Sequence, residues 1–175
     1  MKTVLSLIGI VLAVFVIVVL LQPSEFHVER SIEITAKPNK IFPHINNLKK
    51  ANVWSPWAKL DPNIKQTYSG PEQGVGAQVS WTGNNQVGEG TMTIVESKLN
   101  QLVRNRLDFL KPMEGTSTAD FTLKTEGNKT KVTWSIYGHN NFMAKAMSLI
   151  MNCDKMIGEQ FEKGLADLKT TVEAK

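Results

Sequence analysis

The sequence predicts an α+β fold in which a curved antiparallel sheet wraps around a long C-terminal helix, preceded by one N-terminal transmembrane helix. Three observations predict it. An uncharged apolar run occupies Val4–Leu21, short alternating segments separated by turn residues fill the middle of the chain, and a helical period begins after Asn140. Two short helices, a series of strands and a terminal helix are typical of a sheet packed against a helix.

The apolar run Val4–Leu21 is long enough to cross a membrane as a helix. At about 1.5 Å per residue it spans roughly 27 Å, close to the hydrocarbon thickness of a bilayer. No small-residue cleavage site precedes Gln22 and Pro23, so we expect a retained anchor over residues 1–24 rather than a cleaved signal peptide. Lys2 carries the only side-chain charge before the run, which predicts a cytoplasmic N-terminus. The domain over residues 25–175 would then lie in the periplasm or outside the cell.

A half-buried strand is predicted to begin at Phe26. Apolar residues occupy one face of this segment and polar residues the other, which is the period of a strand with one buried face. The apolar face holds Phe26, Val28, Ile32 and Ile34, and Arg30 falls on the same face.

Arg30 is therefore the polar residue of greatest interest. A buried charge without a partner costs several kcal/mol or more, so we expect its guanidinium to be paired. The candidate partners are Glu89, Asp108 and Asp154, which the sequence does not rank. Alternatively, the planar guanidinium can hold a carboxylate or phosphate of a ligand. A structural salt bridge is the interpretation that we favour.

Two short helices and a series of strands are predicted next. Ala36–Phe42 opens a short helix with Pro38 near its first turn, which Pro43 limits or kinks, and Leu48–Leu60 contains a second short helix followed by a turn. Turn residues then separate strands predicted at Lys65–Ser69, Gly76–Thr82, Glu89–Ser97, Leu102–Leu110, Thr118–Lys124 and Lys131–Tyr137. Such short connections predict antiparallel hairpins rather than parallel strands joined by helices.

One long amphipathic helix is predicted from Asn140 to Val172, because apolar residues recur at steps of three and four. Its first half is apolar almost all round and rich in methionine. Gly164 lies on the same stripe as Cys153 and Leu168, where a close approach to the sheet can offset the helix penalty of glycine. For Gly158 we expect a collision of any larger side chain with the short helices or with a bound molecule.

Composition and motifs exclude several functions. The net charge is +4, but lysines are scattered among acids, so no nucleic-acid partner is expected. A single cysteine excludes an internal disulfide and a cysteine-built zinc site. The three histidines lack metal-ligand spacing, and the sequence has no nucleophile elbow or dinucleotide-binding glycine motif. We therefore expect no metal, no cofactor and no assigned catalytic residue, and nothing identifies a protein partner.

Several runs of the chain together resemble a known superfamily. They are Glu29–Ile34 followed by Ala36 and Pro38, the motif Trp54-Ser55-Pro56-Trp57, Gly74–Ala77, Val132–Trp134, and the terminal series Asp154, Gly158, Phe161, Gly164 and Leu168. The sequence is similar to the START-like (SRPBCC) superfamily, in particular to the bacterial polyketide cyclase/dehydrase and lipid-transport group and its membrane-anchored branch. The resemblance implies a helix-grip fold with a cavity between the sheet and the last helix. It also implies binding of lipids, sterols, polyketides or other apolar molecules, with catalysis in a minority of members.

Large apolar side chains are the main candidates for such a site, because ligand pockets are lined mostly by aromatic and aliphatic groups. The candidate ligand-binding residues are Arg30, Trp54, Trp57, Trp81, Phe109, Trp134, Met147, Ile150, Cys153 and Ile157. Ordinary core packing is the alternative for each apolar residue. Methionines of the last helix can mould to variable ligands. Cys153 is expected on the buried helix face, as a small core residue rather than a nucleophile.

The leading functional hypothesis is a membrane-anchored domain that binds a hydrophobic or amphipathic, lipid-like small molecule. The first alternative is an enzyme of the cyclase, dehydratase or hydrolase type, which requires a perturbed titratable group in the cavity. The second is a membrane-tethered module for protein interaction, which requires an exposed apolar patch outside the cavity.

Overall fold

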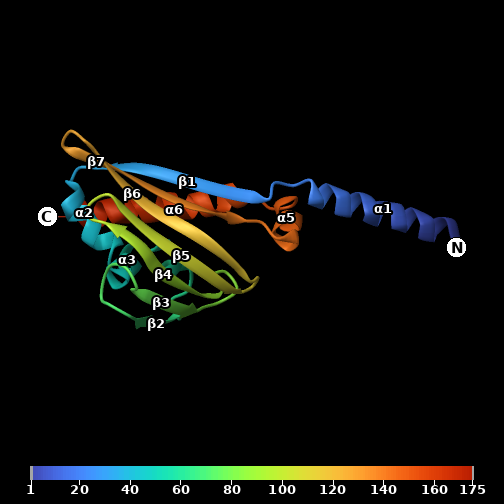
Figure 1. The fold of residues 1–175 in the computed structure, drawn as a ribbon, viewed down its shortest axis with the longest axis horizontal. Coiled ribbons are helices and arrows are strands. Elements are labelled where there is room, and N and C mark those ends of the chain that lie inside the picture. Colours follow the sequence, from blue (N-terminus) through green and yellow to red (C-terminus); the bar gives the residue numbers. More distant parts are fainter. Residues whose placement is uncertain (1, 175) are drawn as a thin grey trace.

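Helix α1 (Lys2–Leu20) projects from one end of the folded domain (Figure 1). The computed structural model describes residues 2–174, without the side chains of Lys2 and Leu5. The charge of Lys2, on which the predicted orientation depends, therefore lies outside the described residues. Most apolar side chains of α1 are exposed, as for Leu7 at 64% and Ile17 at 54%. Among the described residues, no helix meets both the length and the apolarity required of a membrane span.

The centre of the molecule is a single seven-stranded sheet in which every neighbouring pair is antiparallel. Its strands are β1 (Glu25–Ile34), β2 (Lys65–Ser69), β3 (Gln78–Thr82), β4 (Glu89–Lys98), β5 (Leu102–Lys111), β6 (Gly115–Glu126) and β7 (Lys129–His139). Their order across the sheet is β1-β7-β6-β5-β4-β3-β2. The predicted antiparallel hairpins are confirmed. The strand expected from Gly76 begins only at Gln78, because Gly76 lies in a turn with φ of 89°.

The face of β1 that points toward the core is the one that the alternation predicts. Val28 and Ile34 are buried and Phe26 and Ile32 are half-buried, whereas the intervening residues other than Arg30 are exposed. Arg30 shares the inward face, as expected, and its side chain is 26% exposed.

Three short helices connect β1 to β2. They are α2 (Pro38–Ile45), α3 (Leu48–Trp54) and α4 (Pro56–Leu60). The first two match the predicted helices, and the expected turn after α3 contains α4 as a further helix. Ser55 separates α3 from α4 in an extended conformation, because the residue before a proline is disfavoured in the helical region.

The prediction of one continuous helix from Asn140 to Val172 is wrong. The structure has α5 (Phe142–Ser148) and α6 (Cys153–Glu173) with a break between them. Asn141 and Asn152 cap the two helices, since their side-chain oxygens accept hydrogen bonds from the backbone N–H groups of Ala144 and Lys155, both at 2.9 Å. An asparagine cap stabilises a new helix start and so favours the interruption.

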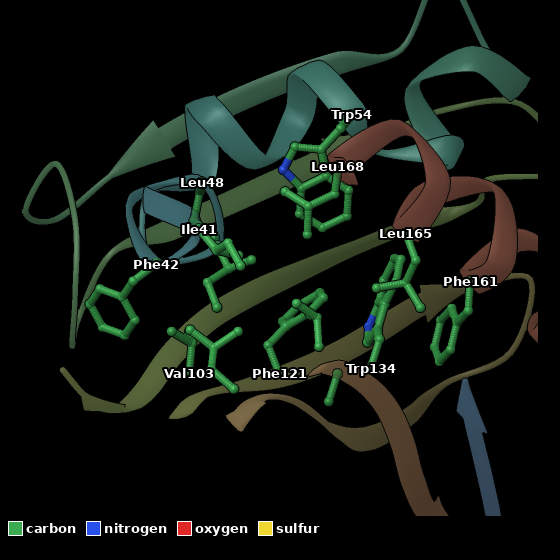
Figure 2. Packing of buried hydrophobic residues seen from close by; sticks show 14 of the residues in the cluster. Ile41, Phe42, Leu48, Trp54, Val103, Phe121, Trp134, Phe161, Leu165 and Leu168 are labelled. Atoms are coloured by element: carbon green, nitrogen blue, oxygen red, sulfur yellow. The ribbon is translucent and has the colours of Figure 1, made fainter. Parts of the chain in front are cut away.

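The core lies between the sheet and α6, and the short helices close one end of it (Figure 2). Leu165 and Leu168 of α6 are almost fully buried, as is Trp54 of α3. A curved antiparallel sheet wrapped around a C-terminal helix is the helix-grip arrangement, which confirms the predicted α+β architecture of the domain.

Two glycines permit close packing along α6. A Cβ at Gly164 would lie 2.8 Å from Cζ3 of Trp134 and 2.9 Å from Cδ of Pro56, so the predicted close approach to the sheet is confirmed. A Cβ at Gly158 would collide with the guanidinium of Arg30. Arg30 of β1, rather than a short helix, is therefore the nearest obstacle to a side chain at Gly158, and contact with a bound molecule stays a prediction.

Candidate ligand-binding cavity

A cavity of about 350 Å³ lies between the sheet and the helices α3 and α6. Its wall is mostly apolar, with side chains from β2 to β7, from α3 and α4 and from the first turns of α6. Binding sites for small molecules have volumes of roughly 300–1,000 Å³ and walls of this kind. The cavity therefore has the size and the surface of a site for a small apolar molecule.

The four tryptophans of the chain all line the cavity. Trp134 of β7 stacks on Phe161 of α6 with ring centroids 4.0 Å apart, and Trp54 meets Trp134 edge to face at 5.6 Å. Edge-to-face and offset aromatic pairs are favourable beyond the area that they bury. Trp54 and Trp134 are thus part of the core and part of the cavity wall at once.

Trp81 and Phe109 form a second aromatic pair at another part of the wall, with centroids 5.9 Å apart. Gly90 of β4 lies opposite Trp81, and a Cβ on it would lie 2.7 Å from Cζ2 of the indole. The absent side chain of Gly90 leaves room for the indole. Sequence reasoning missed this role, although a glycine within a strand often marks a close approach.

Six predicted site residues line the cavity together: Trp54, Trp57, Trp81, Phe109, Trp134 and Ile157. That they bind a ligand stays a prediction. Ile157 reaches the wall from the first turns of α6, so this helix closes one side of the cavity.

Three further residues that the sequence predicts to bind the ligand lie away from the cavity: Met147, Ile150 and Cys153. None of them lines it, Ile150 is 79% exposed and Cys153 is exposed. The physical reason is the break between α5 and α6, which turns this methionine-rich segment away from the sheet. Cys153 becomes the first residue of α6 instead of a residue on its buried stripe.

Arg30 lies outside the cavity wall and is held by the N-terminal half of α6. Its Nε donates to Oε1 of Glu162 at 2.9 Å, and its NH2 group donates to Oδ2 of Asp154 at 3.0 Å. A further bond from its NH1 group to the carbonyl oxygen of Glu29 is 2.7 Å long. Hydrogen bonding from Arg30 holds the pKa of Asp154 below its usual range. These bonds fit the structural interpretation; Arg30 does not line the cavity, and that it binds a ligand stays a prediction.

Of the three predicted partners of Arg30, only Asp154 is confirmed. Glu89 instead pairs with Lys111 at 2.9 Å, and Asp108 pairs with Arg106 at 2.9 Å. Glu162 was not predicted, although it lies two helical turns beyond Asp154 on the same helix.

Polar side chains at one part of the cavity wall are linked to one another. The hydroxyl of Tyr68 donates to Oε1 of Gln66, and Nε2 of Gln66 donates to Oδ1 of Asn52, both at 2.9 Å. Burial raises the pKa of Tyr68, so its hydroxyl remains a donor at neutral pH. Lys111 also lines the cavity, but its ammonium is bound to Glu89. Among the described residues of the wall, Tyr68 and Lys111 are the titratable ones, and no acid is present.

Asn105 is a wall residue that sequence reasoning missed. It is 2% exposed and belongs to β5, where the inward-facing positions also include Val103, Leu107 and Phe109. A polar residue that interrupts an apolar face is the signal that identifies it, the same signal that singled out Arg30 on β1.

Comparisons with known proteins agree with this architecture. Residues 25–173 match the family model described as "Polyketide cyclase / dehydrase and lipid transport". Among curated proteins, none matches the sequence.

Several solved structures have the same fold. A protein of Chromobacterium violaceum is 12% identical with a TM-score of 0.60, and the alignment covers 87% of this chain and 99% of the other. The Aha1 dimer of Colwellia psychrerythraea is 18% identical with a TM-score of 0.57, covering 85% and 96%. A major latex-like protein of Panax ginseng is 14% identical with a TM-score of 0.58, covering 87% and 100%. At these identities the likeness concerns the fold alone.

Proposed function

The chain belongs to the polyketide cyclase / dehydrase and lipid transport family, and from this premise we propose that it binds a hydrophobic, lipid-like small molecule between its sheet and α6. One observation carries the proposal: an apolar cavity of about 350 Å³ whose wall includes all four tryptophans. Transfer of apolar surface from water into such a site is favourable by about 25 cal/mol per Å². A molecule that fills the cavity gains this term without disturbing the fold.

The wall gives no observation that favours an acid–base enzyme. Tyr68 already donates to Gln66, and Lys111 is paired with Glu89. A general base needs a pKa near the operating pH and reach to the proton that it removes. Burial raises the pKa of Tyr68, whereas a tyrosine that acts as a base at neutral pH needs a lowered pKa. Binding is therefore the function that the geometry supports.

We further propose that α1 anchors the protein in a membrane, with the N-terminus in the cytoplasm and the domain in the periplasm or outside the cell. The support is the uncharged sequence Val4–Leu21 and the exposed apolar surface of α1, since a lipid-facing helix is apolar on all sides. No flexible linker follows: Asn140 donates through its backbone N–H to the carbonyl oxygen of Ser24, and Lys145 donates to the Ser24 hydroxyl, both at 2.9 Å.

An exposed apolar surface lies on α5, on the break after it and on the beginning of α6, at the end of the domain from which α1 projects (Figure 1). It includes Phe142 at 44%, Met143 at 57%, Ile150 at 79% and Met156 at 51% exposure. Such a patch is also what the protein-interaction alternative requires. Because α5 contacts α1, we assign the patch to the membrane surface rather than to a protein partner.

The anchor and its orientation are tested together in intact cells. The full chain is expected to sediment with membranes after an alkaline carbonate wash, and protease added to intact spheroplasts is expected to remove the domain. Spheroplasts broken by sonication serve as the control for protease access to both sides. Release of the chain by carbonate would contradict the anchor, and protection of the domain in intact spheroplasts would contradict only the orientation.

Ligand binding is tested by native mass spectrometry of the purified full chain, together with an organic extract of it. The parent is expected to carry an added mass that the extract identifies as an apolar small molecule. Ala119→Phe places a ring in the cavity, because Ala119 is a buried wall residue of β6, and this variant is expected to lose the added mass.

Thr122→Phe is the matched control, since Thr122 is exposed on the same strand and lies on the opposite face from Ala119. It is expected to retain the added mass. Equal occupancy of the parent and of a folded Ala119→Phe variant would place the molecule elsewhere and refute the proposal.

A further inference from the structure

Two buried polar atoms of the cavity wall have no hydrogen-bond partner among the described residues. They are the side-chain oxygen Oδ1 of Asn105, which is 2% exposed, and the indole nitrogen Nε1 of Trp134, which is 7% exposed. Buried polar side-chain atoms in native proteins nearly always have a partner, so each exception requires an explanation. Both exceptions in the described part of this chain belong to residues that line the same cavity.

Two of the other three indoles in the wall do have a partner for their N–H group. Nε1 of Trp54 donates to the carbonyl oxygen of His44 at 3.0 Å, and Nε1 of Trp81 donates to that of Val87 at 3.3 Å. The ring of Trp134 is fixed by its stack on Phe161 and by Trp54, so its N–H cannot turn toward a backbone acceptor without breaking these contacts.

Asn105 and Trp134 lie at separate points of the inward sheet face. Asn105 of β5 pairs with Ala119 of β6, which pairs with Ile136 of β7, and Trp134 is two residues from Ile136. Two strand spacings separate their backbones by roughly 10 Å across the sheet. The amide of Asn105 is held by a bond of 3.5 Å from Nδ2 to the carbonyl oxygen of Ala119. The two polar atoms are thus fixed points in an otherwise apolar wall.

The chemistry of the two atoms restricts the ligand. Oδ1 of Asn105 accepts and needs a donor, whereas Nε1 of Trp134 donates and needs an acceptor. A hydrocarbon satisfies neither atom, and an ionised carboxylate cannot donate to Asn105. An anion would also lose its hydration next to a wall whose ammonium group, that of Lys111, is already bound to Glu89.

We propose that the cavity binds an uncharged, oxygenated apolar molecule, with a ligand hydroxyl donating to Asn105 and a ligand oxygen accepting from the indole N–H of Trp134. This inference rests on the proposed function and narrows its ligand class. Asn105 and Trp134 set the polarity of the ligand, and the aromatic wall contacts its apolar body.

Three brominated probes that share a twelve-carbon alkyl chain test the inference: bromododecane, bromododecanol and bromododecanoate. Bromine quenches tryptophan emission on contact, and every tryptophan of the chain lines the cavity. The probes are titrated into the full chain in one detergent. We expect the parent to bind bromododecanol about three- to tenfold more tightly than bromododecane, as one net hydrogen bond implies, and to bind bromododecanoate most weakly.

Variants assign this preference to residues. In Asn105→Leu the ratio of alcohol to hydrocarbon affinity is expected to fall below the parental value, with hydrocarbon binding retained, because leucine replaces the amide by an apolar group of similar size. Trp134→Phe removes the indole N–H together with one of the two indole rings, so both probes lose apolar contact; the ratio is expected to fall by the share of bound alcohol whose oxygen accepts from Nε1. Thr122→Val, on the outer face of β6, is the control and is expected to keep the parental ratio. Comparing ratios at one detergent concentration cancels partition of the probes into micelles.

The outcomes separate this inference from the proposed function. Equal affinities of the parent for alcohol and hydrocarbon, or a preference that survives in both Asn105→Leu and Trp134→Phe, would refute the inference while leaving apolar binding intact. Tighter binding of bromododecanoate than of the alcohol would also refute it. Absence of saturable quenching by all three probes would refute the proposed function instead.

Discussion

Replacement of Trp54 by alanine is expected to lower the free energy of unfolding by about 3–5 kcal/mol. The side chain is 2% exposed and meets Phe121 and Trp134 edge to face, with centroids 5.7 and 5.6 Å away. Its indole N–H also donates to the carbonyl oxygen of His44 and so joins α3 to the end of α2. Alanine removes these contacts and leaves a void that the surrounding rings cannot fill without moving.

Denaturant unfolding of the full chain measures this cost, and Trp57→Ala is the matched control. Both tryptophans line the cavity, but Trp57 of α4 is only half-buried, so its truncation removes less packed surface than that of Trp54. We expect it to cost less than half as much as Trp54→Ala. Equal costs for the two variants would show that Trp54 does not carry the packing between α3 and the sheet.

Gly164→Leu is expected to destabilise the domain by about 1–3 kcal/mol through overpacking. A Cβ alone would lie 2.8 Å from the indole of Trp134 and 2.9 Å from the ring of Pro56. Both neighbours are rigid rings, so relief requires α6 to move away from β7 and α4. This cost exceeds the gain that a better helix former than glycine would bring at this position.

Gly115→Leu is the control for this substitution. Gly115 begins β6, and no atom lies within 4 Å of the position that its Cβ would take. A change there is expected to stay within about 0.5 kcal/mol of the parent. If Gly164→Leu unfolds at or above the parental denaturant concentration, α6 does not pack closely on the sheet and the helix-grip account of the cavity fails with it.

The sheet was the most predictable part of the fold, because alternation and turn chemistry act locally. Two predicted turns coincide with turns of the structure. One contains Gly83, Asn84 and Asn85 between β3 and β4, and the other contains Lys111 and Pro112 between β5 and β6. The interruption before α6 was not predictable from periodicity. Residues 142–157 are apolar on nearly every side, so the helical period of apolar residues shows no interruption at the break. The cap at Asn152 is the local feature that marks it.

The large apolar residues of the site were predictable from the sequence, whereas its polar contacts were not. Large aromatic residues such as Trp81 and Trp134 gather where a curved sheet closes on a helix, so their size was enough to predict that they line the cavity. The partners of Arg30 are 124 and 132 residues away in sequence, a distance over which charge pairing leaves no local signal. Asn105 was visible as a polar residue on an apolar strand face, but its unpartnered oxygen depends on every side chain around it.

A crystal structure of the full chain saturated with bromododecanol shows where the ligand binds, because anomalous scattering locates the bromine without reference to the rest of the density. We expect a bromine site inside the cavity, between α6 and the sheet, with the alkyl chain of the probe against the rings of Trp134 and Phe121. Bromine sites confined to the surface of α1 and to the detergent around it, with the cavity unchanged, would contradict the account.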